Sequence, residues 1–292
     1  KYHKNRMWYL PMFLVVSAFS KLCGIMWLIV NIPLAFGAVF ISGHWWDHQT
    51  PFCPLGMAKN RRKIHFAKTM PLKTLKMLGH KHGATVNDVL LTVASGATRR
   101  YLESRNFEVT PHMKLRTTFP LDCRGIKQKD DSIDEETFGN QSTLVSIKTP
   151  THIKDPIKRL KKTKKVMDRL KASPLRTLGS WKISLDNFLL KYVPPLRNVA
   201  RELVVGENYN SYNKTTFVTN LHGPTEPRFI CGKQVESIRG VLSFPNTICC
   251  HSYDGQMYIT FCADEYHIPD GDYFVDLFED ELKSMIKGAG LD

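Results

Sequence analysis

Apolar positions recur with helical spacing between residues 83 and 101, and this stretch predicts a long helix with a wide buried face. Thr85 is the expected N-cap, and Asp88 lies three residues on, so the start resembles a capping box with Asp in place of Glu or Gln. The apolar face is made by positions three and four residues apart, namely Val86, Val89, Leu90, Val93, Ala94, Ala97 and Tyr101. Other parts of the chain have to cover so apolar a helix.

Weaker patterns predict the elements that surround this helix. Helical spacing of apolar positions predicts further helical regions at 72–80, 153–171, 174–205 and 273–286. Runs rich in β-branched and aromatic residues predict strands at 64–69, 113–119, 142–148, 215–219, 235–241, 247–252 and 256–262. The last two strands are expected to form a hairpin, and the stretch 220–227, which contains Gly and Pro, is expected to form a sharp loop.

Residues 1–43 predict a membrane-associating segment. Residues 22–42 carry no charge, and as a helix they would span about 31 Å, close to the hydrocarbon core of a bilayer. Basic residues flank the segment on both sides, which favours a hairpin or re-entrant dip over a single pass. The alternative is a pair of core helices that pack on other protein. Residues 44–83 are then a linker and the entry to the main domain, which is expected to occupy residues 84–292.

The charge of the chain favours acidic partners. The net charge is +14, which suits phosphates, anionic membranes or acidic substrates. No zinc-finger spacing, RNA-recognition signature or long basic tail occurs, so no nucleic-acid partner is predicted. The predicted helix 153–171 is strongly basic. Its functional interpretation is attraction to anionic lipid or to the phosphates of a carrier such as coenzyme A. The alternative is the solvated face of an ordinary helix.

The cysteine pattern argues against a disulfide framework. Seven cysteines are spread along the chain, and no two of them have Cys-x-x-Cys spacing. An odd count without such pairs favours a reducing compartment and argues against a structural zinc. No metal site is therefore predicted.

Three stretches of the sequence stand in a characteristic order. They are Ala84-Thr-Val-Asn-Asp-Val-Leu-Leu, Phe138-Gly-Asn-Gln and Thr219-Asn-Leu-His-Gly-Pro-Thr-Glu-Pro. Their order and spacing resemble the C-terminal half of the wax ester synthase/diacylglycerol acyltransferase family, in its plant-like branch. Smaller pieces agree with the same family: Thr50-Pro51, Phe119-Pro with Arg124, Ser252-Tyr-Asp-Gly and Ile268-Pro-Asp. The resemblance covers residues 44–290; its ordered set of motifs is specific, although no single motif is decisive.

The resemblance implies both a fold and an activity. The fold is α/β (α+β), like half of chloramphenicol acetyltransferase or of a peptide-synthetase condensation domain, with a mixed sheet flanked by helices. In that family two halves meet along a tunnel, and a fatty acyl group passes from acyl-CoA to a long-chain alcohol or diacylglycerol. The expected partners are these substrates, a membrane and a missing N-terminal half of the same chain. No cofactor is implied, and the expected location is the endoplasmic reticulum membrane with the domain facing the cytosol.

The catalytic signature of the family, His-His-x-x-x-Asp-Gly, does not occur in this sequence. Its second His is taken to be the general base that removes the proton of the alcohol, a role that suits a neutral imidazole. The stretch most similar to this motif starts at His251, inside the predicted hairpin, where a structural His is expected. His80, His82 and His222 do not stand at the position of the catalytic His either. The catalytic His is therefore expected upstream of residue 1, and this chain alone is expected to be inactive.

Supporting site residues follow from the resemblance. Asn87 and Asp88 match the Asn-Asp motif of the family, which implies a place beside the active site, and helix capping is the alternative role of Asp88. The resemblance implies that further residues shape the tunnel or bind substrate: Gly139, Asn140, Asn220, Gly223 and Pro224. Two other hypotheses stay open, namely a non-catalytic acyl-CoA- or lipid-binding module of this fold and an acyltransferase that uses an amine or a short-chain donor.

Overall fold

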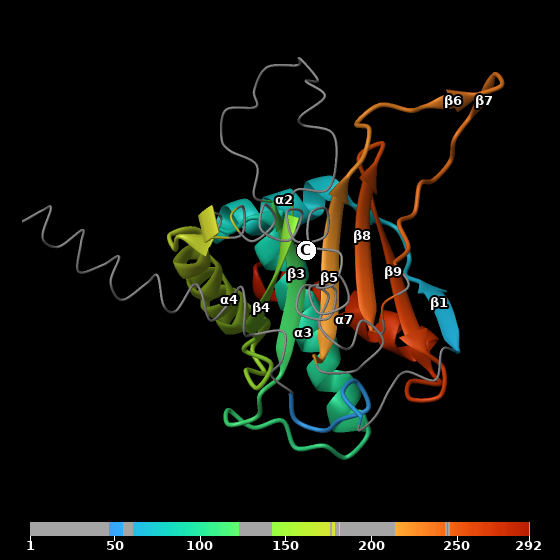
Figure 1. The fold of residues 1–292 in the computed structure, drawn as a ribbon. Helices are drawn as coiled ribbons and strands as arrows, with labels where there is room; N and C mark the ends of the chain where they lie inside the picture. The colour runs from blue at the N-terminus through green and yellow to red at the C-terminus, as the bar shows by residue number, and fades with distance from the viewer. Residues whose placement is uncertain are drawn as a thin grey trace, which may run out of the picture.

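The computed structural model of the chain describes residues 47–54, 61–122, 142–175, 177–178, 181, 214–242, 244 and 246–291. Within this part, the main feature is one mixed sheet in the order β1-β9-β8-β5-β3-β4, with β2 also paired to β9 (Figure 1). Its strands are β1 (Arg62–Phe66), β2 (Met70–Pro71), β3 (Arg116–Asp122), β4 (Ser142–Lys148), β5 (Thr216–His222), β8 (Thr247–Tyr253) and β9 (Gln256–Asp264).

The centre of the sheet is parallel and its margins are antiparallel. Strand β5 pairs in parallel with both β3 and β8. Strand β4 is antiparallel to β3, β9 is antiparallel to β8, and β1 is antiparallel to β9. Because β3, β5 and β8 run in the same direction, their carboxyl ends lie at the same edge of the sheet. Open α/β sheets commonly bind ligands outside such an edge.

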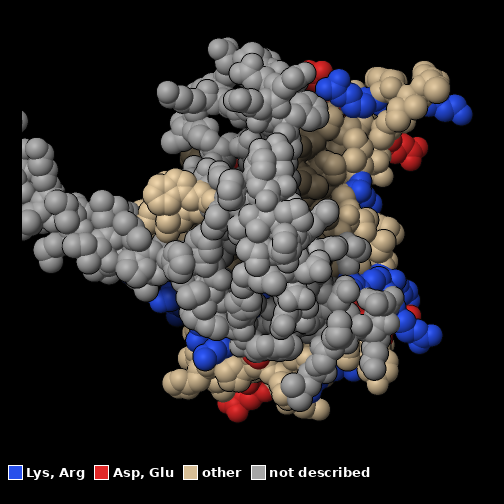
Figure 2. Space-filling view, viewed as in Figure 1, with Lys and Arg blue, Asp and Glu red and all other residues tan. Residues whose placement is uncertain are grey.

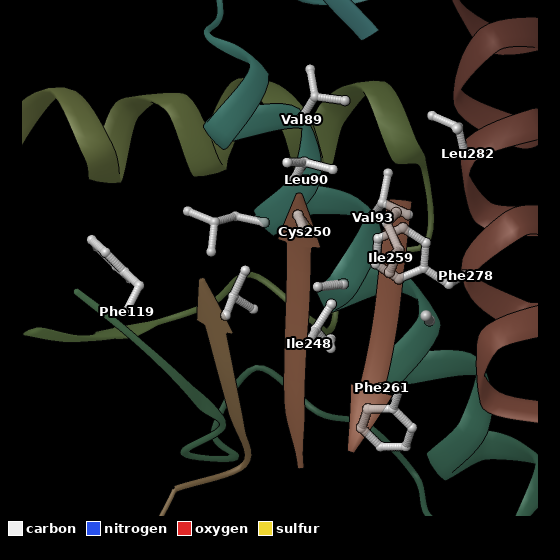
Figure 3. Close-up of a cluster of buried hydrophobic side chains, with 14 of the residues drawn as sticks. Val89, Leu90, Val93, Phe119, Ile248, Cys250, Ile259, Phe261, Phe278 and Leu282 are labelled. Atoms are coloured by element: carbon white, nitrogen blue, oxygen red, sulfur yellow. The ribbon is translucent and has the colours of Figure 1, made fainter. Parts of the chain in front are cut away.

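The helices pack on one face of the sheet. They are α2 (Leu72–Lys81), α3 (Val86–Ser104), α4 (Pro156–Lys171) and α7 (Gly271–Gly288). Helices α3 and α7 contact each other and the sheet, and α4 contacts both of them (Figure 1). Figure 3 shows side chains of α3 and α7 meeting the inner side of β8 and β9. The expected mixed sheet flanked by helices is confirmed.

Most of the predicted elements are present. The helices expected at 72–80, 153–171 and 273–286 correspond to α2, α4 and α7, and the central helix begins at its predicted cap. The strand expected at 142–148 is β4, and the predicted hairpin is formed by β8 and β9. The strand expected at 64–69 overlaps β1, which starts two residues earlier and pairs with β9.

The prediction of a strand at 235–241 is wrong. This segment crosses the face of β8 and β9 that is opposite to the helices, and side chains of the sheet hold its backbone. Tyr253 Oη donates to the Val235 carbonyl at 2.8 Å, and Tyr258 Oη donates to the Glu236 carbonyl at 3.1 Å. Its carbonyl groups are thus satisfied by hydroxyl groups beneath it instead of by a neighbouring strand.

Two boundaries differ from the sequence prediction. Strand β3 was expected at 113–119, but it starts at Arg116 and continues through Pro120 to Asp122. Pro120 lies opposite Leu144 of β4, beyond Thr117 and Thr118, through which β3 pairs with β5. Strand β5 continues to His222, so the first three residues of the expected loop belong to the strand.

An arm that carries β6 (Phe229–Ile230) and β7 (Lys233–Gln234) projects from the sheet (Figure 1). Figure 2 shows Lys and Arg atoms beside uncharged atoms on this arm. The segment 1–43, predicted to associate with membranes, and most of the region 174–205 lie outside the described residues. Among the described helices, none combines the length and apolarity needed to cross a bilayer.

Candidate functional site

Several predicted site residues meet at the edge where β5 and β8 end. The pairing of these parallel strands continues to His222 opposite Ser252, so the two strands end side by side at the same edge of the sheet. The first turn of α3 reaches the same edge, since Asn87 lies there within hydrogen-bond distance of Asn220. This edge is the candidate site.

The central contact of the site joins two amide side chains that are far apart in sequence. Asn220 Nδ2 donates to Asn87 Oδ1 at 2.6 Å. Asn87 is exposed, and Asn220 is half-buried near the end of β5. Asn220 Oδ1 is shielded from solvent and has no hydrogen-bond partner in the part of the chain that the structure describes. The pair therefore offers uncharged polar atoms, which suit a hydroxyl or carbonyl oxygen better than an ion.

Gly223 allows the two strand ends to approach closely. A Cβ atom at this position would lie 2.2 Å from the Ser252 carbonyl oxygen and 2.7 Å from His251 Nε2, so only glycine fits. The Gly223 N–H donates to Ser252 Oγ at 3.3 Å. The carbonyl group of Pro224 accepts from the Asp254 N–H at 3.0 Å. Gly223 and Pro224 thus shape the backbone at the candidate site.

Asp88 caps its own helix. Its Oδ2 atom accepts from the Thr85 N–H at 2.8 Å and from Thr85 Oγ1 at 2.8 Å, and the Asp88 N–H donates back to Thr85 Oγ1 at 3.3 Å. The side chain is almost fully buried, and Lys171 Nζ lies 3.8 Å from Oδ2. These contacts are those of the predicted capping box, so the structure gives Asp88 a capping contact next to Asn87.

His251 lies on β8 beneath the loop at Gly223. Its Nδ1 atom is buried without a hydrogen-bond partner among the described residues, and its Nε2 atom faces Gly223. Burial lowers the pKa of His251. Within the described part of the chain, no carboxylate is hydrogen-bonded to this ring to orient it as a general base, which agrees with the structural role expected for it.

Two of the expected site residues, Gly139 and Asn140, lie outside the described residues. Lys171 was not singled out as a site residue, although it contacts Asp88; its place in a lysine-rich helix gave no signal that distinguishes it from its neighbours. Among the described residues, no group of three or more His, Cys, Asp or Glu side chains could hold a metal ion. The expectation that no cofactor is used stays a prediction.

A mixed sheet with its helices on one face, and with polar side chains gathered at the carboxyl ends of its parallel strands, defines the class of protein: an α/β domain with a candidate site at that edge. Comparison with known proteins then identifies the family. The family model for the WS/DGAT C-terminal domain matches residues 138–286, about half of the chain. The chain belongs to the wax ester synthase/diacylglycerol acyltransferase family, as its motifs indicated.

Individual relatives agree with this membership. The chain is 27% identical to wax ester synthase/diacylglycerol acyltransferase 10 of Arabidopsis thaliana over 264 residues, which are 82% of this chain and 52% of that protein. It is 24% identical to the O-acyltransferase WSD of Acinetobacter baylyi over 195 residues, which are 67% of this chain and 39% of that protein. The chain thus spans about half the length, or less, of these relatives.

A solved structure shows the same fold. The wax ester synthase/diacylglycerol acyltransferase from Marinobacter aquaeolei VT8 superposes with a TM-score of 0.53 and 19% sequence identity. The superposition covers 78% of this chain and 49% of that chain. At this identity the likeness concerns the fold alone, and it places the described sheet and helices in the architecture of the family.

Proposed function

We propose that this chain is the C-terminal half of a membrane-associated O-acyltransferase. It would act in the transfer of a fatty acyl group from acyl-CoA to a long-chain alcohol, a diacylglycerol or both. The expected location is the endoplasmic reticulum membrane, with the domain facing the cytosol. Membership of the family supports acyl transfer as the reaction class.

The observation that carries the proposal is the contact between Asn87 and Asn220. These residues belong to two separate family motifs, yet their amides are joined at 2.6 Å at one edge of the sheet. Open α/β folds bind ligands at such edges. Uncharged amides suit the oxygen atoms of an alcohol and a thioester, which are neutral before reaction. The pair would therefore orient a substrate oxygen.

Acyl transfer needs a general base, and the sequence motif that carries this base in the family is absent from the chain. The alcohol oxygen attacks the thioester carbonyl, a C–O bond forms, the C–S bond breaks, and the alcohol proton ends on the released thiol. The proposal places the base, the second His of His-His-x-x-x-Asp-Gly, in a segment that precedes residue 1. Asn87 and Asn220 would then be positioning residues beside that base.

The test is an acyl-transfer assay on the native gene product that contains this chain. Membranes that contain the protein receive labelled oleoyl-CoA with either hexadecanol or dioleoylglycerol, and ester products are quantified. Asn87→Ala and Asn220→Ala are each expected to lower kcat/KM about tenfold, the worth of one substrate-orienting hydrogen bond. The double variant should be little worse than either single variant, because each amide holds the other.

A matched control removes an amide elsewhere. Asn106 follows the C-terminal end of α3 with a φ of 61°, and Asn106→Gly keeps that conformation accessible. This variant should transfer acyl groups at the rate of the unmodified protein. Full activity of both site variants would overturn the role of the pair. Robust ester formation by residues 1–292 alone would overturn the placement of the base outside this chain.

The absence of His-His-x-x-x-Asp-Gly from the sequence keeps one alternative open. In that alternative the protein is a non-catalytic acyl-CoA- or lipid-binding module of the same fold. The same assay separates the two functions when it is combined with equilibrium binding of oleoyl-CoA. Tight binding by the native gene product without ester formation would favour the binding module.

A further inference from the structure

Helix α4 presents a continuous basic surface that the fold does not use. Five cations lie at positions three or four residues apart, all exposed: Lys158, Lys161, Lys162, Lys165 and Arg169. At 100° per residue they occupy one arc of about 100°, and the stripe is about 16 Å long. We call these five residues the α4 stripe. Leu160, Thr163 and Met167 are buried on the opposite side of the helix.

Within the residues that the structure describes, the other cations of α4 form ion pairs and those of the stripe do not. Arg159 is buried against Glu281, Lys164 pairs with Asp168, and Lys171 pairs with Asp88. No ion pair involves any member of the α4 stripe within the described part of the chain. Exposed helices commonly mix opposite charges three or four residues apart, so five cations together on one arc leave a field that an external anion can neutralise.

Burial and the positive charge around the α4 stripe lower the pKa values of two neighbouring histidines. Burial, followed by the charges of Lys148 and Lys162, lowers the pKa of His152. Burial, followed by the charges of Lys161 and Lys81, lowers the pKa of His82. Both rings therefore border a region of positive potential. An anionic surface that approached the stripe would reduce this potential.

We propose that the α4 stripe is an electrostatic contact with an anionic lipid surface. A straight row of cations along one helix side suits a flat array of negative headgroups, to which each Lys or Arg contributes independently. The uncharged run 22–42 of the same chain is consistent with a membrane nearby. The stripe has no aromatic side chain interleaved with its cations for base stacking, which disfavours single-stranded nucleic acid as the partner. Figure 1 shows α4 on the outside of the domain, away from the edge strand β1.

This inference does not rest on acyl transfer, because it concerns charge alone. Contact of the α4 stripe with anionic lipid would orient the domain with its α4 side toward the bilayer. The uncharged run 22–42 would bind neutral and anionic bilayers alike, and the cations that precede it, Lys1, Lys4, Arg6 and Lys21, are unchanged in both variants below. The relevant quantity is therefore the ratio of partition coefficients between anionic and neutral vesicles, not binding to vesicles as such.

The experiment measures this ratio for the whole chain and two variants. Vesicles contain either phosphatidylcholine alone or phosphatidylcholine with phosphatidylserine, at physiological salt. In the stripe variant, Lys158, Lys161, Lys162 and Lys165 are all changed to Gln. In the control variant, four exposed lysines on other elements and loops are changed to Gln, namely Lys63, Lys68, Lys114 and Lys233. Both variants lose the same net charge.

We expect the unmodified chain to prefer phosphatidylserine vesicles. The stripe variant should lose up to about six-hundredfold in the ratio, since each of the four Lys near such a surface strengthens binding about fivefold. The control variant should keep most of the preference, and high salt should abolish it. The substituted lysines are exposed, so far-UV circular dichroism and thermal unfolding should match for all three proteins.

Three results would overturn the proposal. The first is an unchanged ratio in the stripe variant. The second is an equal loss in the control variant, which would mean that net charge alone matters. The third is competition by inorganic phosphate, at constant ionic strength, or by a short DNA duplex, at low concentration. Such competition would indicate a discrete phosphate site or a nucleic-acid surface instead of a lipid contact.

Discussion

The carboxylate of Asp88 accepts hydrogen bonds from Thr85, the N-cap of its own helix, so substitution of Asp88 should affect the stability of the fold. Asp88→Ala should lower the free energy of unfolding by about 1 kcal/mol, the usual worth of a cap. Thr85→Ala should cost a similar amount, and the double variant should cost less than the sum, because both residues serve one capping box. Urea unfolding of the four proteins measures these energies.

The acyl-transfer assay gives this prediction its second readout. If Asp88 serves the helix, Asp88→Ala should keep its kcat/KM once the fraction of folded protein is taken into account. A loss of tenfold or more at unchanged stability would contradict the capping role. It would instead make Asp88 a functional neighbour of Asn87.

The half-buried ring of His251 predicts a loss of stability in acid. Burial lowers the pKa of His251 below its unfolded value of about 6.5. As the pH falls below about 6.5, the unfolded chain binds a proton that the folded chain does not. The free energy of unfolding should therefore fall by up to about 1.4 kcal/mol per pH unit until the folded pKa is reached.

Comparison of variants isolates this contribution. His251→Gln should flatten the dependence of the free energy of unfolding on pH between 7.5 and 5.5, as measured by urea titration. His112 is exposed, and His112→Gln supplies a matched replacement that should leave the slope of the unmodified chain in place. An unchanged slope in His251→Gln would show that His251 takes up its proton equally in both states.

At the scale of elements, a buried charge cluster connects three helices. Glu281 of α7 accepts from Arg100 of α3 at 2.7 Å and from Arg159 of α4. Gly96 lies against these side chains, so α3 can approach closely. Glu281→Ala should lower the free energy of unfolding by about 3–5 kcal/mol, because it removes the carboxylate that neutralises the buried guanidinium of Arg159 and leaves it only backbone carbonyl groups.

The neighbouring residue gives the control for this prediction. Asp280 has a half-exposed side chain and one long contact with Lys283, at 3.5 Å. Asp280→Ala should change stability by less than about 0.5 kcal/mol. Chemical denaturation of both variants measures the difference. Equal effects would mean that the cluster does not hold the three helices together.

Elements with a strong local signal were predictable, and elements held by distant side chains were not. The 3.6-residue period located α2, α4 and α7, which each bury one face, and it located α3, although residues 88–99 of α3 are buried on every side. The segment 235–241 has the composition of a strand, but its carbonyl groups bond to Tyr253 and Tyr258 beneath it. A β-prone composition indicates that side chains are half-buried, but it does not show which groups form hydrogen bonds with the backbone.

At the scale of the whole molecule, the segment 1–43 should keep the protein in membranes. The chain is expected to stay in the membrane pellet after extraction with alkaline carbonate and to be released by detergent. The reason is the run 22–42, which has no charge to favour its return to water. Immunoblots of pellet and supernatant measure this distribution.

Charges placed inside the run provide the comparison. Leu28→Arg together with Ile32→Arg should move the protein to the supernatant, since each Arg at the centre of a span costs about 2.5–3.5 kcal/mol. The stripe variant of α4 should stay in the pellet, because carbonate already removes electrostatic contacts. Complete extraction of the unmodified chain by carbonate would contradict the membrane segment and leave the α4 proposal to its own test.

The sequence by itself determined the helices and the capping box of α3, because these depend on residues close together in the chain. It also determined the family, because the order of three motifs can be read along the chain without knowing how they pack. It also indicated Asn87 and Asn220 as separate candidates through their motifs. Only the tertiary structure decided that the two amides share a hydrogen bond and that the five side chains of the α4 stripe are exposed on one side of the domain. Both facts depend on which elements lie side by side, and that is set by the packing of helices on the sheet and not by any local pattern.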